Sequence, residues 1–123
     1  MKEPRFDLDY TYGRQGELLI KDILEQLAAG DARIETKRPR NPDPMFYVET
    51  HQNAWGLGEW KPSGIQTTES EYHAIVLGDT GNVVMVPTRT LRAAARRAHT
   101  ARCERGDNPT EGVLVDLRDA LGW

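Results

Sequence analysis

Apolar and polar positions recur along the chain with two periods, one helical and one typical of strands. From Tyr12 to Ala29 the leucines and isoleucines follow helical spacing, and Gly30 is a common helix end. Residues 32–37 and 45–51 alternate at every second position, as strands with one buried face do. The proline-rich segment 38–44 between them predicts a loop, and residues 1–10 predict an irregular arm.

The middle of the chain predicts a connection, a short helix and a hairpin. Residues 52–66 contain several glycines and a proline, which predict an irregular connection. Thr68 and Glu71 have the spacing of a capping box, which favours a short helix over residues 67–73. Two apolar stretches, residues 74–77 and 82–86, flank a turn sequence and predict a pair of buried strands.

The last part of the chain predicts a helix, a strand and a short terminal turn or helix. Residues 88–102 are rich in alanine and arginine and predict the helix, while residues 113–117 predict the strand. A helix, two strands, a short helix, two strands, a helix and a strand then follow one another. This order predicts an α/β fold with a mixed sheet, and a length of 123 residues predicts a single domain.

Composition excludes several classes of protein. Hydrophobic residues make up 38 % of the chain, and no apolar run approaches the ~20 residues that a membrane-spanning helix needs. The N-terminal segment lacks the apolar stretch of a secretory signal. A single cysteine, Cys103, excludes an internal disulfide framework and a cysteine-rich zinc site. We therefore expect an intracellular, cytoplasmic protein with no membrane partner.

Positive charge is concentrated in one segment of an otherwise acidic chain. The net charge is -3, yet residues 86–106 contain six arginines and one acidic residue. On the predicted helix Arg89, Arg92 and Arg96 lie on one side. This arginine row can face solvent or contact nucleic-acid phosphates, and the charge pattern leaves both interpretations open.

Acidic side chains recur at positions from which they can converge. Glu35 and Lys37 are two apart on a predicted strand, so both leave the same face, and Glu49 shares a face with Tyr47 and His51 on the next strand. If these strands pair, Glu35 and Glu49 come close together. Glu17 lies on or beside the apolar stripe of the first helix. A carboxylate there must be paired, bind a metal or lie at the edge of the stripe.

Converging carboxylates beside a lysine form a site of oxygen ligands suited to Mg²⁺ or Mn²⁺. Such an ion can polarise a phosphodiester and lower the pKa of an attacking water, which a nearby lysine can orient. Glu35 and Lys37 alone favour an ordinary exposed ion pair. Glu49 and Glu17 at workable positions shift the balance toward a metal site.

Three short motifs carry a resemblance to a known family. They are Gly13-Arg-Gln-Gly-Glu17 opening a helix, Ile34-Glu-Thr-Lys37 and Tyr47-Val-Glu49. In this order they resemble the PD-(D/E)XK nuclease superfamily, and within it small phage-type endonucleases or Holliday-junction resolvases. The segment from Lys61 to Tyr72 is also similar to the stretch that follows the second acidic strand there. The resemblance spans roughly residues 12–95.

The resemblance implies a small restriction-endonuclease-like fold over residues 1–123, with a mixed central sheet flanked by helices. It implies that Glu17 is the helical acid, Glu35 the first strand acid and Glu49 the second, with the backbone carbonyl of Thr50 completing a site for Mg²⁺ or Mn²⁺. It also implies DNA as the partner, a homodimer and a phage-encoded protein in a bacterial host.

The signature lysine of the family is the point of departure. The family places it two residues after the second acid, where this chain has His51. Either Lys37 serves from the neighbouring strand, or Lys61 serves from the connection, or the role is lost. In a competing alignment Glu35-Thr36-Lys37 is itself the E-x-K motif. That alignment needs an earlier acid, and Asp31 is too close along the same strand.

Polar residues near these motifs are candidates for phosphate contacts. Arg38 and Arg40 follow the first strand, and three hydroxyl residues, Ser63, Thr67 and Thr68, precede the predicted short helix, whose N-terminus suits a phosphate oxygen. We expect a Mg²⁺-dependent endonuclease acting on DNA, including branched or junction DNA. The alternatives are a silenced nuclease fold that binds nucleic acid or serves as a structural subunit, and an accessory protein whose acids form only surface ion pairs.

Overall fold

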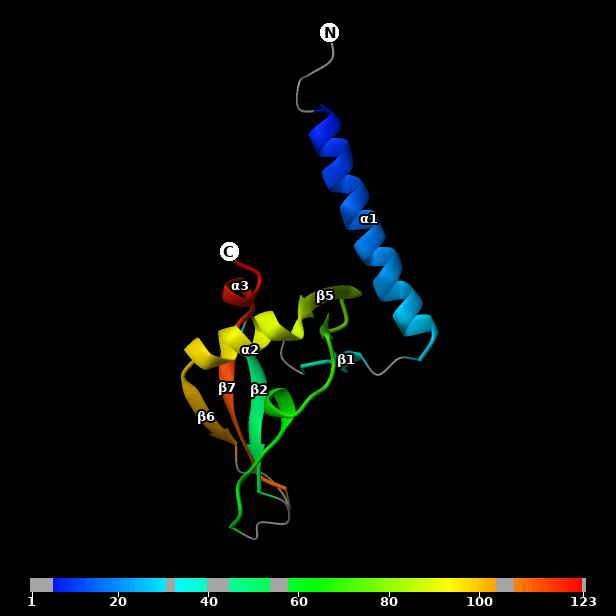
Figure 1. Ribbon diagram of the computed structural model, residues 1–123. Helices are drawn as coiled ribbons and strands as arrows, with labels where there is room; N and C mark the ends of the chain where they lie inside the picture. Colours follow the sequence, from blue (N-terminus) through cyan, green and yellow to red (C-terminus); the bar gives the residue numbers. More distant parts are fainter. Residues whose placement is uncertain (1–5, 31–32, 40–44, 54–57, 104–107, 123) are drawn as a thin grey trace. The chain divides into compact units, whose positions relative to one another are not determined.

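The computed structural model describes residues 6–30, 33–39, 45–53, 58–103 and 108–122 (Figure 1). The chain separates into two compact units, residues 1–32 and residues 33–123. The mixture of helices and strands confirms the α/β class, while the single-domain organisation stays a prediction. In the described part, no helix is long and apolar enough to cross a membrane.

The first unit contains the helix α1, Phe6–Ala28. The expected helix is confirmed, but it begins at Phe6, so the prediction of an irregular arm is wrong for residues 6–10. Gly30 ends the helix with φ +68° and donates its amide to the Leu27 carbonyl at 3.1 Å. Ile23 is buried, whereas four neighbours in the predicted apolar stripe are 48–58 % exposed: Leu19, Ile20, Leu24 and Leu27. A single helix has no core of its own in which to bury such a stripe.

A mixed three-stranded sheet forms the first layer of the second unit (Figure 1). Its order is β1-β4-β5, where β1 is Ile34–Lys37, β4 is Tyr72–Leu77 and β5 is Asn82–Pro87. β1 pairs with β4 in parallel, and β4 pairs with β5 in antiparallel orientation. The hairpin predicted over residues 74–86 is confirmed.

An antiparallel four-stranded sheet has the order β3-β2-β7-β6. Its strands are β3 (Lys61–Pro62), β2 (Met45–Gln52), β7 (Thr110–Asp116) and β6 (Thr100–Cys103). The 3-10 helix η2, Gly64–Gln66, packs against β2. β2 confirms the predicted strand over residues 45–51, and β7 contains most of the strand predicted over residues 113–117.

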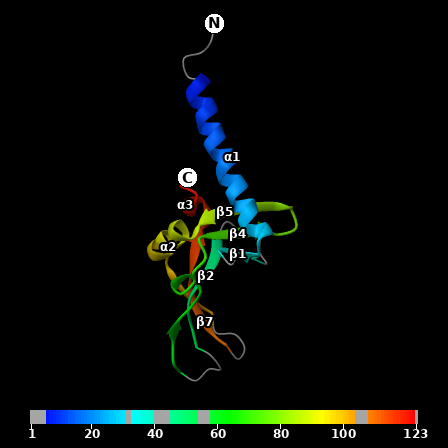
Figure 2. The same ribbon diagram turned by 45° about the vertical axis from the view of Figure 1, so that its right-hand side comes forward.

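Helix α2, Thr88–Arg97, and the short helix α3, Leu117–Ala120, pack against β7 and against each other (Figure 2). Leu91, Ala94 and Ala95 of α2 are buried in one cluster with side chains from both sheets, including Phe46, Val48, Ile75, Val86, Val113 and Val115. The core of the second unit is therefore shared by its two sheets.

Two helix predictions are wrong because tertiary pairing overrides local propensity. Residues 67–71 are not helical, since the amides of Glu71 and Tyr72 donate to the Arg33 carbonyl at 2.6 and 3.0 Å and lead the chain into β4. α2 ends at Arg97 instead of continuing to residue 102. The backbone is extended at Ala98, and residues 100–103 pair with β7 as strand β6.

The two acidic strands do not pair with each other. β1 has β4 as its partner, and β2 lies between β3 and β7 in the other sheet. We expected Glu35 and Glu49 to come close together if their strands paired. Within the described strands, β1 and β2 do not pair. Both acidic residues nevertheless line one cavity.

Candidate functional site

A cavity of about 520 Å³ is lined by residues from both sheets of the second unit. β1 supplies Glu35 and Lys37, β2 supplies Tyr47 and Glu49, and β4 supplies His73. Apolar walls come from Phe46, Val48, Ile65, Leu91 and Leu114. The cavity therefore brings together both strand acids and one candidate lysine, although their strands belong to different sheets.

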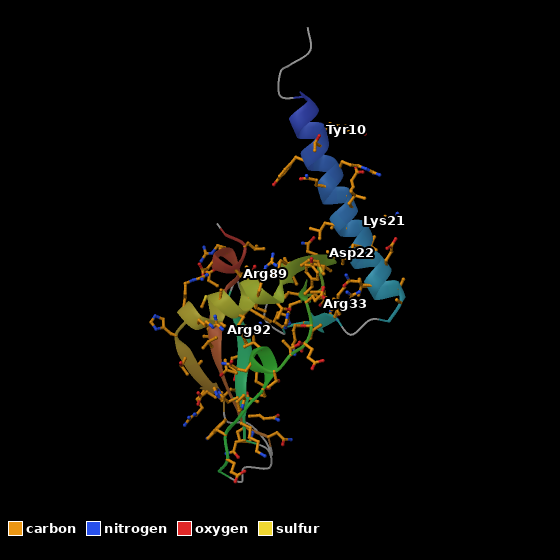
Figure 3. The ribbon with its side chains drawn as sticks, in the orientation of Figure 1. Tyr10, Lys21, Asp22, Arg33, Arg89 and Arg92 are labelled. Carbon is orange, nitrogen blue, oxygen red and sulfur yellow. The ribbon has the colours of Figure 1, made fainter. Side chains whose placement is uncertain are left out.

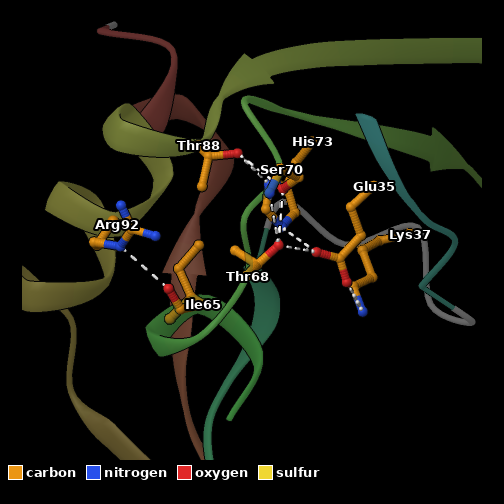
Figure 4. Close-up of polar contacts among 8 residues, drawn as sticks. All are labelled: Glu35, Lys37, Ile65, Thr68, Ser70, His73, Thr88 and Arg92. Atoms are coloured by element: carbon orange, nitrogen blue, oxygen red, sulfur yellow. Dashed lines mark hydrogen bonds and ion pairs between the residues drawn. The ribbon is translucent and has the colours of Figure 1, made fainter. Parts of the chain in front are cut away.

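Glu35 is held by three side chains (Figure 4). Its Oε1 lies 2.8 Å from Lys37 Nζ, while its Oε2 accepts a hydrogen bond from Thr68 Oγ1 at 3.0 Å and lies 3.2 Å from His73 Nε2. Burial opposes ionisation of the carboxyl group, but hydrogen bonds from Lys37 and Thr68 and the charge of Lys37 outweigh it. The pKa of Glu35 therefore lies below its ordinary value.

His73 is the functional residue that sequence reasoning missed. It is the Cα partner of Glu35 in the parallel ladder, so the two side chains lie on the same face. Its ring is buried, and its Nδ1 lies 2.9 Å from Thr88 Oγ1. Burial lowers the pKa of His73 despite the raising effect of the Glu35 charge, which favours the neutral ring. The available signal was a polar residue within an otherwise apolar strand, since a buried polar group needs partners.

Glu49 is positioned by a close contact between β2 and η2. Gly64 has φ +56°, and a Cβ there would collide with the Glu49 carbonyl and lie 2.9 Å from the Glu49 Cβ. Both the left-handed backbone and the lack of space require glycine at this position. Gly64 therefore lets η2 approach the backbone beside the second acid.

His51 and Thr50 do not line the cavity. A bulge between Glu49 and His51 interrupts the alternation of β2, so the expectation that His51 shares the face of Glu49 is wrong. His51 Nδ1 lies instead 3.8 Å from Glu111 Oε1 on β7. The Thr50 carbonyl accepts the Ser63 amide at 2.9 Å, which gives it a partner within the protein.

The structure distinguishes the two candidate lysines by position. Lys37 lines the cavity and contacts Glu35. Lys61 lies on β3, where its side chain is 72 % exposed and 4.0 Å from Glu59 Oε2. Lys37 thus lies beside Glu35. Both alignments require this position: the one in which Lys37 replaces the signature lysine, and the competing one in which Glu35-Thr36-Lys37 is the E-x-K motif. Asp31, which the competing alignment considered, lies outside the described residues.

Glu17 lies on α1 in the first unit, and the structure describes it within that unit alone. Its Oε2 is 2.9 Å from Arg14 Nη1, one helical turn earlier, and its side chain is 70 % exposed. The carboxylate is therefore paired within the helix and largely exposed, and its role as a metal ligand stays a prediction. Figure 3 shows the side chains of α1, with Tyr10, Lys21 and Asp22 labelled.

The candidate phosphate ligands have different environments. Arg38 lines the cavity, but its guanidinium contacts Asp79 and donates to the Gly78 carbonyl at 3.2 Å. Arg40 lies outside the described residues. Ser63 is buried, Thr67 is exposed, and neither lines a cavity, so only Thr68 of the three hydroxyl residues reaches the site.

A second cavity of about 420 Å³ is lined by Thr68 and by Arg89 and Arg92 of α2; Figure 3 labels the two arginines. Arg92 Nε donates to the Ile65 carbonyl at 3.1 Å, which fixes the base of its guanidinium. Arg96 is exposed on the same helix and does not line this cavity. Glu69 and Glu71 also line it, so its charges are mixed.

The donor set of the main cavity suits a hard divalent cation. Within the described ranges, no three acidic, histidine or cysteine side chains are grouped closely enough to hold a metal. Mg²⁺, however, usually retains several waters and binds proteins through one or two carboxylates together with substrate phosphates. Glu35 and Glu49 are two acidic residues of this cavity, and Lys37 adds a positive charge beside Glu35.

Comparisons of the chain with protein-family models, with curated proteins and with solved structures found no match in any of the three. The case for a function therefore depends on the residues of the cavity and on the order of the motifs in the sequence.

Proposed function

We propose that this chain is a metal-dependent endonuclease that hydrolyses DNA phosphodiester bonds at the cavity containing Glu35, Lys37 and Glu49. The observation that supports the proposal most directly is that these three residues line one cavity, Glu35 and Lys37 from one sheet and Glu49 from the other. They are the residues that the resemblance to PD-(D/E)XK nucleases assigns to the site. The mixed β1-β4-β5 sheet supports the α/β class that the resemblance implies, whereas the second, antiparallel sheet departs from the single central sheet expected.

Each residue has a role in the proposed reaction. Glu35 and Glu49 hold Mg²⁺ or Mn²⁺, which when bound polarises the phosphodiester and lowers the pKa of a water. The water oxygen bonds to phosphorus as the bond to one bridging oxygen breaks, and the water proton passes to the departing oxygen. The Lys37 ammonium stabilises negative charge on the phosphate in the transition state.

Arginines around the cavity supply the contacts to DNA in this proposal. Arg38 lines the cavity, and Arg89 and Arg92 lie in the neighbouring one, so a strand seated at the acids can meet several cations. Such contacts make affinity fall steeply with salt. We propose a homodimer, because two sites are needed to cut both strands of a duplex or junction.

Catalytic silencing is the second candidate. It is favoured by His51, which stands where the family has its lysine and points toward Glu111 instead of the cavity. The presence of Lys37 beside Glu35 favours the active enzyme, because this lysine is placed to replace the missing one.

Cleavage of labelled linear duplex, flap and four-way-junction DNA in Mg²⁺ or Mn²⁺ tests the proposal. Glu35→Gln and Glu49→Gln keep the side-chain size and remove the charge, so we expect each to lower the cleavage rate by about 100-fold or more. Glu111→Gln removes a carboxylate on β7 that lines neither cavity. It is the matched control and should leave the cleavage rate unchanged.

The remaining outcomes separate the candidates. Salt-sensitive DNA binding without cleavage by the wild type would favour the silenced fold. Absence of both would reject both candidates and leave the accessory-protein interpretation. Equal loss in Glu35→Gln and Glu111→Gln would mean that the cavity is not the active site.

A further inference from the structure

Five side chains form a closed ring of polar contacts behind Glu35 (Figure 4). From Glu35 Oε2 the ring runs to Thr68 Oγ1, to Ser70 Oγ and to Thr88 Oγ1. It then passes through His73 and returns to the same carboxylate oxygen. The successive distances are 3.0, 2.9, 3.2, 2.9 and 3.2 Å. We call these five residues the Glu35 ring.

The ring is built into the fold and is not a surface network. Ser70, His73 and Thr88 are each less than 10 % exposed, so they are largely shielded from water. Thr88 begins α2 and donates its amide to the Glu71 carbonyl at 2.8 Å, which fixes its position. Helix α2 and strands β1 and β4 therefore all contribute to the environment of one carboxylate.

The carboxylate sets the direction of the contact between Glu35 and His73. An ionised carboxylate only accepts hydrogen bonds, so His73 must carry a proton on Nε2 to bond Glu35. In the neutral ring Nδ1 then has no proton and accepts from the Thr88 hydroxyl, because the partner of one nitrogen sets the tautomer of the ring. The carboxylate thus sets the tautomer of His73, and the Thr88 hydroxyl, which can donate or accept, is compatible with it.

We infer that His73 is a positioning residue for Glu35: through Nε2, and together with Thr68, it engages one carboxylate oxygen and leaves the other for a cation. This inference rests on the proposed function, in which Glu35 holds a divalent cation. The engaged oxygen is Oε2, and the oxygen left for the cation is Oε1, which contacts the flexible Lys37 side chain in the structure. Partners of this kind orient a ligand and typically change metal affinity by about 10–100-fold.

The tautomer can be measured in the wild-type protein without any substitution. Long-range ¹H–¹⁵N correlation spectra distinguish the two neutral forms of His73. We expect the proton on Nε2, and a proton on Nδ1 would overturn the inference. Glu35→Gln replaces one carboxylate oxygen by an amide nitrogen and should mix the tautomers, whereas Thr88→Ser keeps the hydroxyl and should not.

Affinity for Mn²⁺, measured by calorimetry on the full chain, tests the consequence for Glu35. His73→Phe should weaken binding by about 10-fold or more, and His73→Gln should restore most of it, because its amide nitrogen reaches the position of Nε2. His99→Phe, at an exposed histidine outside both cavities, is the matched control and should bind as the wild type does. A merely structural role would lower thermal stability in both His73 variants and leave Mn²⁺ affinity unchanged, which would overturn the inference.

Two further measurements keep the outcomes distinct. If His73→Phe does not fold, Thr68→Val against Thr68→Ser tests the other donor to Oε2, and equal Mn²⁺ affinity in this pair would overturn the inference. If the wild type does not bind Mn²⁺, or binds it equally well with Glu35→Gln, the proposed function falls and the inference with it. Glu35-dependent binding that His73 variants leave unchanged would reject the inference alone.

Discussion

Two clusters of this molecule contain the same kinds of side chain in different surroundings. In the first, Glu35 lies between Lys37 and His73 at 2.8 and 3.2 Å. In the second, Glu111 lies between Arg102 and His51 at 2.7 and 3.8 Å. The histidine side chain is 4 % exposed in the first cluster and 34 % exposed in the second.

The comparison shows that an acid, a base and a histidine do not make a site by themselves. Glu35 shares a cavity with a second carboxylate, and its histidine is buried and bonded on both nitrogens. Glu111 lines neither cavity, and its arginine lies over the ring of Trp60, 4.9 Å from the centroid. The buried histidine and the second acidic residue of the cavity distinguish the candidate site from the Glu111 cluster, since the two glutamate side chains are similarly exposed, 29 and 25 %.

The largest expected difference between the two clusters is the effect of removing the positively charged side chain, Lys37 in the first and Arg102 in the second. Lys37→Met should lower the rate of metal-dependent DNA cleavage by about 100-fold or more, because it removes the positive charge beside the two acids. Arg102→Met should leave the rate within about 2-fold, since the Glu111 cluster is outside the cavity. Single-turnover cleavage assays compare the two variants, and Lys61→Met tests the second candidate lysine. An equal loss in Lys37→Met and Arg102→Met would contradict the distinction.

A smaller effect is expected from the glycine that makes room for the second acid. Gly64→Ala should destabilise the fold by about 1–3 kcal/mol from backbone strain alone, and more because Cβ collides with Glu49. Gly81→Ala is the control, since Gly81 also has positive φ but an open surrounding. Urea unfolding measures both. Equal losses would mean that the contact between η2 and Glu49 is not tight.

The smallest effect should come from acidifying the exposed cluster. The hydrogen bond from Arg102 lowers the pKa of Glu111 below its ordinary value of 4.5. The contribution of this pair to stability is therefore complete above pH 4.5 and is lost as the pH falls through the lower folded value. Glu111→Gln should be slightly less stable than the wild type at pH 7 and equally stable in strong acid.

Salt provides the control for that prediction. About 0.5 M NaCl should reduce the difference between the wild type and Glu111→Gln at pH 7, because exposed pairs are screened by ions. Thermal unfolding in both buffers measures it. A difference that persists in acid would contradict the assignment of the stabilisation to the charged pair.

Local patterns predicted the parts of the fold that depend on neighbours in sequence. Alternation placed Glu35 and Lys37 on one face of a strand, and both line the cavity. Glycines around a polar turn predicted the β4–β5 hairpin. The helix predicted from Thr68 and Glu71 did not form, because Thr68 bonds Glu35 and the Glu71 amide bonds Arg33. Those partners lie far away in the chain, so spacing within the segment carried no sign of them.

The candidate site was predicted only in part for the same reason. Its acids and lysine lie in short motifs, whereas the link from His73 to Glu35 depends on strand register and the link to Thr88 on the start of α2. His51 was assigned to the face of Glu49 because strict alternation ignores bulges, and a single bulge breaks it. Sequence patterns predict the face of a regular strand but not where its regularity ends.

The parallel pairing of β1 with β4 has a consequence for how the protein folds. Parallel partners are distant in the chain, and their ladder forms only after a long loop closes. The β4–β5 hairpin is local and can form first, with His73 already in place on it. A chain at that stage has no acid beside the histidine. During refolding, the recovery of Mn²⁺ binding should therefore follow the docking of edge strand β1 and lag behind the appearance of the hairpin.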